Sequence, residues 1–567
     1  MKKIFIVIGC LCLFAGLFSG ILRPVSAEAA QPVALVSRTV PVYINGAENK
    51  QDLPLYFSAG GDIPFISLED WEGILNLIGS LSDPVYQITS ETDGDIFRYV
   101  RETGYSADFN FADNTIYFTD RNEFSKKSSG YLFALEENGE TAELFQRSDS
   151  SFSRHGKDTM IDLGDYGIPM YVQDGRHFIP LQTFSDILLT ARSEIALFNG
   201  ECIIITDGMT ETEKEIYYSA PKQAVSSEFG VFNYNELCMA LDNLYGLSEA
   251  HGITSFRDVF HKTALDQILS GTDITAVDKT LYAFINFYID DLHSSYGTPS
   301  YNSDRESVQA YKMNIGRGSA FNKLYEYRSD LRSARASYYP EGIPAYEEVG
   351  NTAYITFDHF EDAPEGTDYN TLPGEDELDY AIRLMQYACS RILREDSPVQ
   401  NVVVDLSNNT GGSGTVASYV IGTFLGRSMI SMKDVQTGAL LNAVSNIDTN
   451  MDHQFDEMDT LAGKGLKFFC FTSPVSFSCG NLVPCVFRES GKVALIGRTT
   501  GGGSCNVQIL STASGTAFQV SGPYQISFLK NGSFYDADRG TDPDIYIYDM
   551  SKLYDREYMT EFINSIR

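Results

Sequence analysis

The sequence predicts an α/β protein built from three successive parts. Residues 28–220 alternate short β-branched and aromatic runs with Asn-Gly and Asp-Gly turn signals, which is typical of hairpins. Residues 221–300 carry apolar residues at helical spacing. Within residues 301–567, strand and helix patterns alternate from about residue 350 onward, which indicates a buried, mostly parallel sheet.

The amino terminus predicts export from the cell. Two lysines precede an uninterrupted apolar run, Ile4–Leu22, and the small residues of Val25–Ala27 fit the positions that a signal peptidase reads. We therefore expect residues 1–27 to be a signal peptide, with cleavage before Glu28 and a secreted or cell-surface location. The alternative is an uncleaved membrane anchor, because the run is long enough to span a bilayer.

The β-rich part contains two weakly similar halves. In the first, Val40–Ile44 runs into an Asn-Gly turn, and a helical pattern follows around Trp71. In the second, Met170–Val172 reaches an Asp-Gly turn, and a helical stretch follows at Phe184–Leu189. The order resembles a duplicated module found at the amino terminus of copper amine oxidases, without implying copper. We expect an accessory domain that contacts a partner or the cell wall.

The helical part and the core follow in order. The polar segment at 297–345 gives no assignment. The predicted helices are 234–245, 256–269, 274–292, 375–393, 416–425, 481–489 and 552–566. The predicted strands of the core are 352–357, 402–404, 467–471 and 493–496, with two more near Phe518 and Ile526.

The net charge of −34 limits the partners of this chain. An acidic surface repels the phosphates of nucleic acids and anionic lipids. We therefore expect no nucleic-acid partner, and a membrane partner only if the signal peptide stays uncleaved.

Three loops that follow predicted strands carry candidate functional residues, and in an α/β sheet such loops build the site. The first, 405–412, ends in Gly411 and Gly412, whose amides could turn inward as an oxyanion hole requires. The second places Ser478 at the start of a helix, where a serine is either a helix cap or a nucleophile. The third, 497–505, is rich in glycine.

Together these segments resemble a family. The ordered strings DLSNNTGG, SFSCGN, GKVALIGRTTGGGS and GTDPDI, between residues 405 and 545, are similar to those of the C-terminal-processing peptidases, which include tail-specific and tricorn-like serine peptidases. The resemblance implies a ClpP/crotonase-like core and hydrolysis of a peptide or protein substrate without a cofactor.

The resemblance also implies roles for single residues. Ser478 aligns with the nucleophile, and the amide of Cys479, with one from Gly411 or Gly412, would form the oxyanion hole. Where the tail-specific branch has a catalytic lysine, this chain has Gly503.

The general base is therefore sought in the tricorn-like branch, which uses a histidine. The string DDLHS at 290–294 resembles that branch and makes His293 the candidate base, since an imidazole accepts a proton near neutral pH. Asp538, or alternatively Asp536, would supply the orienting acid. The interval at 297–345 is too short for an inserted PDZ module, so we expect the PDZ-less branch.

An acidic loop suggests a metal site. Asp448, Asn450 and Asp452, with Asp456 and Asp459 downstream, have the rhythm of a calcium loop, although the usual turn glycine is absent. The alternative is a solvated acidic loop.

Three functional hypotheses follow. The first is a secreted or cell-surface serine endopeptidase that uses Ser478 and His293. The second is a catalytically inactive peptide- or wall-binding protein on the same fold, which Gly503 in place of lysine favours. The third is an amidase that acts on peptidoglycan cross-bridges by the same mechanism.

Overall fold

The computed structural model describes residues 34–82, 87–125, 143–364 and 366–566. The predicted signal peptide, residues 1–27, lies outside the described residues. Among the helices of the described ranges, none has the length and apolar character that crossing a bilayer requires. The α/β class with a β-rich first part and a helical middle part is confirmed.

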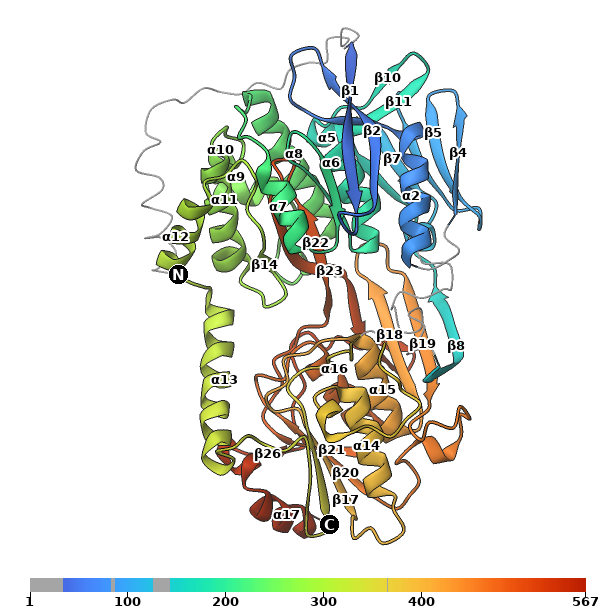
Figure 1. Cartoon of the computed structure of the whole chain (residues 1–567), viewed down its shortest axis with the longest axis vertical. Helices are drawn as coiled ribbons and strands as arrows, with labels where there is room; N and C mark the ends of the chain where they lie inside the picture. Colours follow the sequence, from blue (N-terminus) through green and yellow to red (C-terminus); the bar gives the residue numbers. More distant parts are fainter. Residues whose placement is uncertain (1–33, 83–86, 126–142, 365, 567) are drawn as a thin grey trace.

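Two lobes lie one above the other and are joined by a few long elements (Figure 1). The upper lobe contains a seven-stranded sheet with the order β10 (Tyr171–Gln173), β11 (Arg176–Pro180), β3 (Phe65–Ser67), β2 (Lys50–Ser58), β1 (Leu35–Ile44), β13 (Ile203–Thr206) and β12 (Ile195–Phe198). Its five-stranded sheet has the order β4 (Ile88–Asp93), β5 (Ile96–Arg101), β6 (Ser106–Asn110), β7 (Thr115–Phe118) and β9 (Thr159–Asp162).

The two similar halves of the sequence meet in the seven-stranded sheet. Each half places a strand directly before a helix, and these two strands, β3 and β11, pair antiparallel. Trp71 of the first half and Phe184 of the second pack edge to face, with ring centroids 4.9 Å apart. The helices of this region are α2 (Leu68–Ser82), α3 (Arg121–Ser125), α5 (Leu163–Tyr166), α6 (Leu181–Phe184), η1 (Ser185–Leu189), η2 (Thr190–Arg192) and α7 (Glu211–Ser219).

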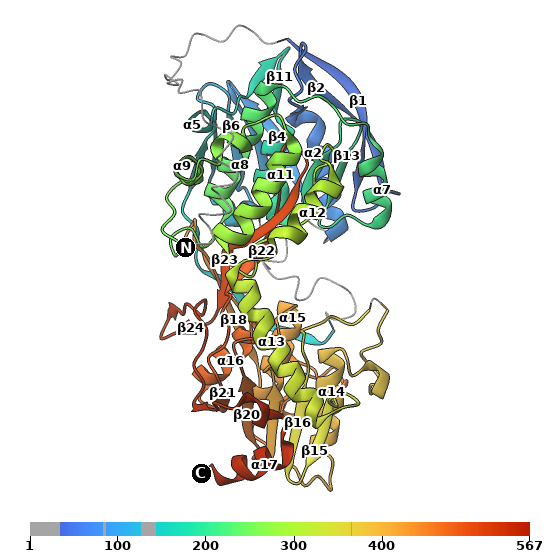
Figure 2. The same ribbon diagram turned by 90° about the vertical axis from the view of Figure 1, so that its left-hand side faces the viewer.

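The helical middle part completes the upper lobe. Its elements are α8 (Ser227–Leu244), α9 (Phe256–Lys262), α10 (Asp266–Leu269), α11 (Ile274–Ala283), η3 (Phe284–Ile289) and α12 (Arg305–Ile315). The predicted helix at 274–292 therefore changes to a π-helical turn after Ala283 and ends at Asp290, whose φ of 48° is left-handed. A 20-residue helix, α13 (Ser319–Tyr338), then runs down to the lower lobe (Figures 1 and 2).

The lower lobe contains a six-stranded sheet with the order β15 (Tyr346–Val349), β16 (Thr352–Thr356), β17 (Asn401–Asp405), β20 (Lys467–Thr472), β21 (Val493–Gly497) and β26 (Ile545–Tyr546). All neighbouring pairs from β16 to β26 are parallel, as the continuous apolar runs predict. Two apolar clusters cover the two faces of this sheet, because successive side chains of a strand point to opposite sides.

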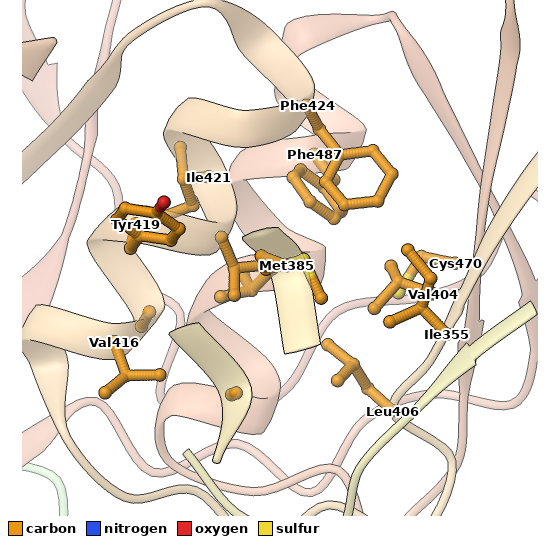
Figure 3. Packing of buried hydrophobic residues seen from close by; sticks show 14 of the residues in the cluster. Ile355, Met385, Val404, Leu406, Val416, Tyr419, Ile421, Phe424, Cys470 and Phe487 are labelled. Carbon is orange, nitrogen blue, oxygen red and sulfur yellow. The ribbon is translucent and has the colours of Figure 1, made fainter. Parts of the chain in front are cut away.

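Helices form the outer layers of the lower lobe. One face carries α14 (Ala381–Ile392), α15 (Gly414–Leu425) and α16 (Cys479–Ser490), and Figure 3 shows Met385, Tyr419, Phe424 and Phe487 packed together above Val404 and Cys470. The other face carries η6 (Met550–Tyr554) and α17 (Arg556–Ser565). Two short 3₁₀ turns, η4 (Glu375–Glu377) and η5 (Glu457–Asp459), lie in the connecting loops.

A further sheet joins the lobes and takes strands from all three parts of the sequence. Its order is β14 (Ser295–Tyr296), β23 (Ala517–Ser527), β18 (Ser428–Asp434), β19 (Leu440–Ile447) and β8 (Phe145–Arg154), with β22 (Cys505–Ser511) paired to β23. A small hairpin, β24 (Leu529–Lys530) and β25 (Ser533–Phe534), follows. Strands β22 and β23 extend from the lower lobe into the upper lobe (Figures 1 and 2). The boundaries at 220 and 300 stay predictions, but the segments on either side share this sheet.

Candidate active site

The three glycine- and serine-rich loops meet at one edge of the lower sheet. Strands β17, β20 and β21 are adjacent and parallel, so their carboxyl ends lie side by side. The backbone of the β20 loop is bonded to both neighbours: Phe477 N–H donates to the Asn409 carbonyl over 3.1 Å, and Ser478 N–H donates to the Gly502 carbonyl over 2.9 Å. The loops that hold the predicted residues are therefore in direct contact.

Ser478 does not act as a helix cap, although it lies at the start of a helix. It directly precedes α16, yet its side chain makes no capping hydrogen bond, and its φ of 56° and ψ of −123° lie outside the ordinary regions. Such a backbone costs about 1–3 kcal/mol and persists only where the surroundings impose it. The partly exposed hydroxyl is free for chemistry at the positive end of a helix.

Gly411 makes room for the serine. Its φ is +101°, and a Cβ atom there would lie 2.6 Å from Cβ and 3.1 Å from Oγ of Ser478. A larger residue at this position would displace the serine, so only glycine lets the 405–412 loop approach so closely.

Two backbone amides beside Ser478 have no hydrogen-bond acceptor among the described residues, namely those of Gly412 and Cys479. The Gly411 amide, by contrast, donates to Asn409 Oδ1 over 2.9 Å. The Cys479 thiol contacts the Gly412 carbonyl at 3.2 Å, which ties the two segments together. Of the two candidate glycines, Gly412 thus has the available amide, and the pair Gly412 and Cys479 fits an oxyanion hole.

Phe477 fills the space that a side chain at position 503 would need. A Cβ atom on Gly503 would lie 2.3 Å from Cε2 of Phe477. The ring of His293 packs against the same phenyl ring, with the centroids 4.7 Å apart. The residue that leaves no room for a side chain at position 503 therefore also contacts the predicted base, one position before Ser478.

His293 is buried, with 7% of its surface exposed, and burial lowers the pKa of its imidazole below 6.5. The carboxylates of Asp291 and Asp538 oppose this effect by stabilising the charged ring. Neither ring nitrogen forms a hydrogen bond within the described ranges, so no bond to Ser478 Oγ is present in this structure.

Asp291 organises the turn that carries the histidine, and the sequence reasoning missed it. Its Oδ1 accepts the His293 amide at 3.1 Å and the Ser294 amide at 2.8 Å. The hydroxyls of Tyr245 and Ser521 donate to the same carboxylate at 3.0 and 2.9 Å. An aspartate two residues before a candidate histidine is a recognisable signal for such a turn.

The predicted acid lies close to the base without a hydrogen bond to it. Asp538 Oδ1 accepts the Ser504 amide at 2.9 Å, and its carbonyl accepts the Gly503 amide at 3.2 Å. Asp536 accepts the amide of Asp538 at 2.9 Å. Asp538 therefore fixes the 497–505 loop and adds negative charge near His293, while its role as the orienting acid stays a prediction.

Comparison with known proteins identifies this domain. Residues 351–547 match the model of peptidase family S41. This part of the chain is therefore similar to the S41 peptidases. No curated protein sequence matches the chain.

Several solved structures resemble the chain at low sequence identity. The photosystem II D1 C-terminal processing protease is 15% identical over 36% of this chain and 45% of its own, with a TM-score of 0.25, so the match spans less than half of that protein. A lipoprotein from Streptococcus agalactiae is 12% identical over 60% and 98%, with a TM-score of 0.35. Mature CPAF complexed with lactacystin is 11% identical over 60% and 97%, with a TM-score of 0.37.

A buried ion pair anchors the start of the 405–412 loop, which we call the oxyanion loop. Asp405, at the end of β17, accepts from Arg556 Nη2 at 2.8 Å, and both side chains are at most 2% exposed. The other carboxylate oxygen accepts the amide and hydroxyl of Ser407 at 3.0 and 2.6 Å. The carboxylate thus anchors the first turn of the loop to α17.

We expect Asp405→Ala to lower the free energy of unfolding by about 3 kcal/mol, because Arg556 would keep its buried charge without its nearest carboxylate. Urea unfolding followed by circular dichroism measures this. The matched control is Glu489→Ala, which removes an exposed pair with Lys530 and should cost less than about 1 kcal/mol. Equal losses in the two variants would contradict the prediction.

The acidic loop at 448–459, within the S41 match, brings three carboxylates together. Oxygen atoms of Asp448, Asp452 and Asp459 lie within 4.8 Å of one another. Both oxygens of Asp448 accept backbone amides, from Met451 at 2.7 Å and from His453 at 2.8 Å. Burial raises the pKa of Asp459 to about 6. These carboxylates order their own loop, and calcium binding there stays a prediction.

Proposed function

We propose that the chain is a secreted or cell-surface serine endopeptidase in which Ser478 is the nucleophile and His293 the general base. The observation that carries this proposal is the serine itself. Its hydroxyl caps nothing, its backbone is held in a strained conformation, and two unbonded amides lie beside it. A structural serine at a helix start would use its oxygen as a cap.

The proposed reaction proceeds through an ester. Ser478 Oγ attacks the substrate carbonyl while His293 takes the hydroxyl proton, and the amides of Gly412 and Cys479 bind the resulting oxyanion. His293 then gives the proton to the leaving amine. Water, activated by the same imidazole, hydrolyses the ester and regenerates the serine.

Two carboxylates serve the base in this scheme. Asp291 holds the backbone of His293 and, of the two, exerts the stronger charge effect on its pKa. Asp538 contributes from the 497–505 loop. We also propose that the S41 core is ClpP/crotonase-like and that the chain belongs to the PDZ-less branch, with target or wall contact left to the upper lobe.

The inactive binding protein remains the second candidate, because no hydrogen bond joins His293 to Ser478 in this structure. Catalytic hydrogen bonds are often loose without substrate, so this geometry does not remove the proposal. An amidase of peptidoglycan cross-bridges would share the mechanism and differ only in its products. Mass analysis of a digest of purified cell wall identifies it.

The deciding experiment is reaction of the purified mature chain with a fluorophosphonate probe, read by intact mass. We expect one adduct per chain, lost in both Ser478→Ala and His293→Ala. A folded wild-type chain that takes no label across neutral pH would establish the binding-protein alternative instead.

The pH dependence follows from the sign of the His293 shift. The imidazole must be neutral to accept the proton, and its pKa lies below 6.5, so kcat/KM should fall only as the pH drops below 6.5. Asp291→Asn removes a charge that raises this pKa and should move the acid limb to still lower pH. Peptide hydrolysis measured from acid to neutral pH tests both points. A midpoint above 6.5, or a shift to higher pH in Asp291→Asn, would contradict the assignment.

A further inference from the structure

An uncompensated group of basic side chains lies along α13, although the chain as a whole carries a net charge of −34. Three arginines follow one another at helical spacing. Arg335 is neutralised by Asp358, which accepts from both of its terminal nitrogens at 3.0 and 2.9 Å. Arg328 and Arg332 form no ion pair within the described residues.

Arg328 contacts His359, but not all of its hydrogen-bond donors have a partner. Its Nη2 lies 3.1 Å from Nε2 of His359, and its Nε is buried without a hydrogen-bond partner. Burial and the neighbouring Arg332 and Arg335 lower the pKa of its guanidinium, while Asp358 acts in the opposite direction. Burial, Arg328 and Arg332 lower the pKa of His359 as well. Among the described residues, Arg328 therefore has no ion pair of its own, and the nearest carboxylate, Asp358, is already paired with Arg335.

This basic group is connected to the 405–412 loop through His359. His359 Nδ1 lies 3.1 Å from the hydroxyl of Thr410, which precedes Gly411 in the oxyanion loop. Gly411 in turn lies against Ser478. Two side-chain contacts thus lead from Arg328 to the loop that surrounds the reacting serine.

The helix that carries the arginines is held by contacts at its start and in its second half. At its start, the amides of Ser319 and Ala320 donate to the carboxylate of Asp290 at 3.1 and 3.0 Å. Further along, Leu331 is buried against Val475, three residues before Ser478. The arginines therefore lie on a helix that is packed against the segment before Ser478, and not on a free segment.

The nearby acids do not neutralise the group. Asp358 is already paired with Arg335 and also accepts a hydrogen bond from the side-chain amide of Asn408. Glu361 is exposed and affects His359 only at a distance. A guanidinium binds a carboxylate with paired, charge-assisted hydrogen bonds, which makes a carboxylate the complementary ligand.

We propose that Arg328, assisted by Arg332, binds a carboxylate of the peptide that occupies the active site, and so selects substrates that present a carboxylate there. This inference rests on the proposed peptidase function and names its substrate class. The carboxylate comes either from an Asp or Glu side chain or from the end of the peptide chain, and the two sources share the same chemistry.

The test uses the Ser478→Ala chain, which binds peptides without cleaving them. Four fluorescent pools of random octapeptides are compared by anisotropy, with Glu or Gln fixed at the centre and with a free or an amidated carboxyl end. We expect at least one carboxylate to tighten binding by about tenfold, because hydrogen bonds between charged groups are stronger than those between neutral groups. The Glu-amide and Gln-acid pools reveal which source is used.

Variants on α13 identify the binding group. Adding Arg328→Gln should reduce the preference to less than about twofold, whereas Lys323→Gln on the same helix should preserve it. Arg332→Gln, at an exposed position, should give a smaller loss of the carboxylate preference. This variant also tests the inference if Arg328→Gln fails to fold. Equal binding of all four pools, no binding of any pool, or a preference that survives Arg328→Gln and Arg332→Gln would overturn the inference.

Failure of this inference is distinguishable from failure of the proposed function. Fluorophosphonate labelling of the Arg328→Gln chain with Ser478 intact reports the nucleophile alone. Labelling without a carboxylate preference overturns the inference only, and a carboxylate preference without wild-type labelling overturns the peptidase only.

Discussion

Replacing Ser478 with alanine should lower kcat for peptide hydrolysis by about 10⁵- to 10⁶-fold, the range expected when a serine nucleophile is removed. The fold should be kept, because the hydroxyl makes no capping bond to α16. Peptide binding should be kept as well. Initial rates with a quenched fluorescent peptide, together with thermal melting of both chains, measure the effect.

Ser490→Ala is the matched control, since Ser490 ends the same helix and its hydroxyl donates only to the Phe487 carbonyl. We expect its rate to stay within about twofold of the wild type, as is usual for a surface substitution away from the site. If Ser478→Ala retained activity within about tenfold, another group would be the nucleophile and the proposed mechanism would be wrong.

Replacing His293 with glutamine should lower kcat by about 10⁴-fold, because the amide keeps the size of the ring but cannot accept the serine proton. The variant loses the packing of the imidazole against Phe477, so we also expect a loss of stability. This loss should be much smaller than the loss of activity. The same peptide assay measures kcat, and urea unfolding measures stability.

His261→Gln serves as the control for this variant, because His261 is an exposed residue of α9 that pairs with Asp266. His359 provides the discriminating comparison, since its Nδ1 lies 3.1 Å from the Thr410 hydroxyl in the oxyanion loop. If His359→Gln lost as much kcat as His293→Gln, or if His293→Gln stayed within about tenfold of the wild type, the base would be reassigned.

The sheet of the S41 core was predictable because its strands are fully apolar. Val402–Val404 and Lys467–Phe471 became β17 and β20 within one or two residues. Both are buried on two faces, so the hydrophobic run itself marks the strand. The loops after them follow from the parallel order, which brings the carboxyl ends together.

Other features had no local signal. Helix α13 has a single buried residue, Leu331, so its sequence shows no apolar face, and it escaped assignment. The pairing of β8 with β19 joins residues nearly 300 positions apart and depends on tertiary contacts alone. The role of Asp291 is local but was hidden, because a turn-forming aspartate resembles any surface acid until its partners are known.

The proposed nucleophile and the proposed base come from different lobes. Ser478 belongs to the lower lobe, whereas His293 leads into β14, which pairs with β23 where that strand enters the upper lobe. A fragment limited to residues 351–547 would hold the serine and the oxyanion amides but no base. The smallest competent fragment must begin upstream of Asp291. In the proposed mechanism, catalysis therefore requires that the two lobes stay packed in the arrangement that β14 and β23 fix.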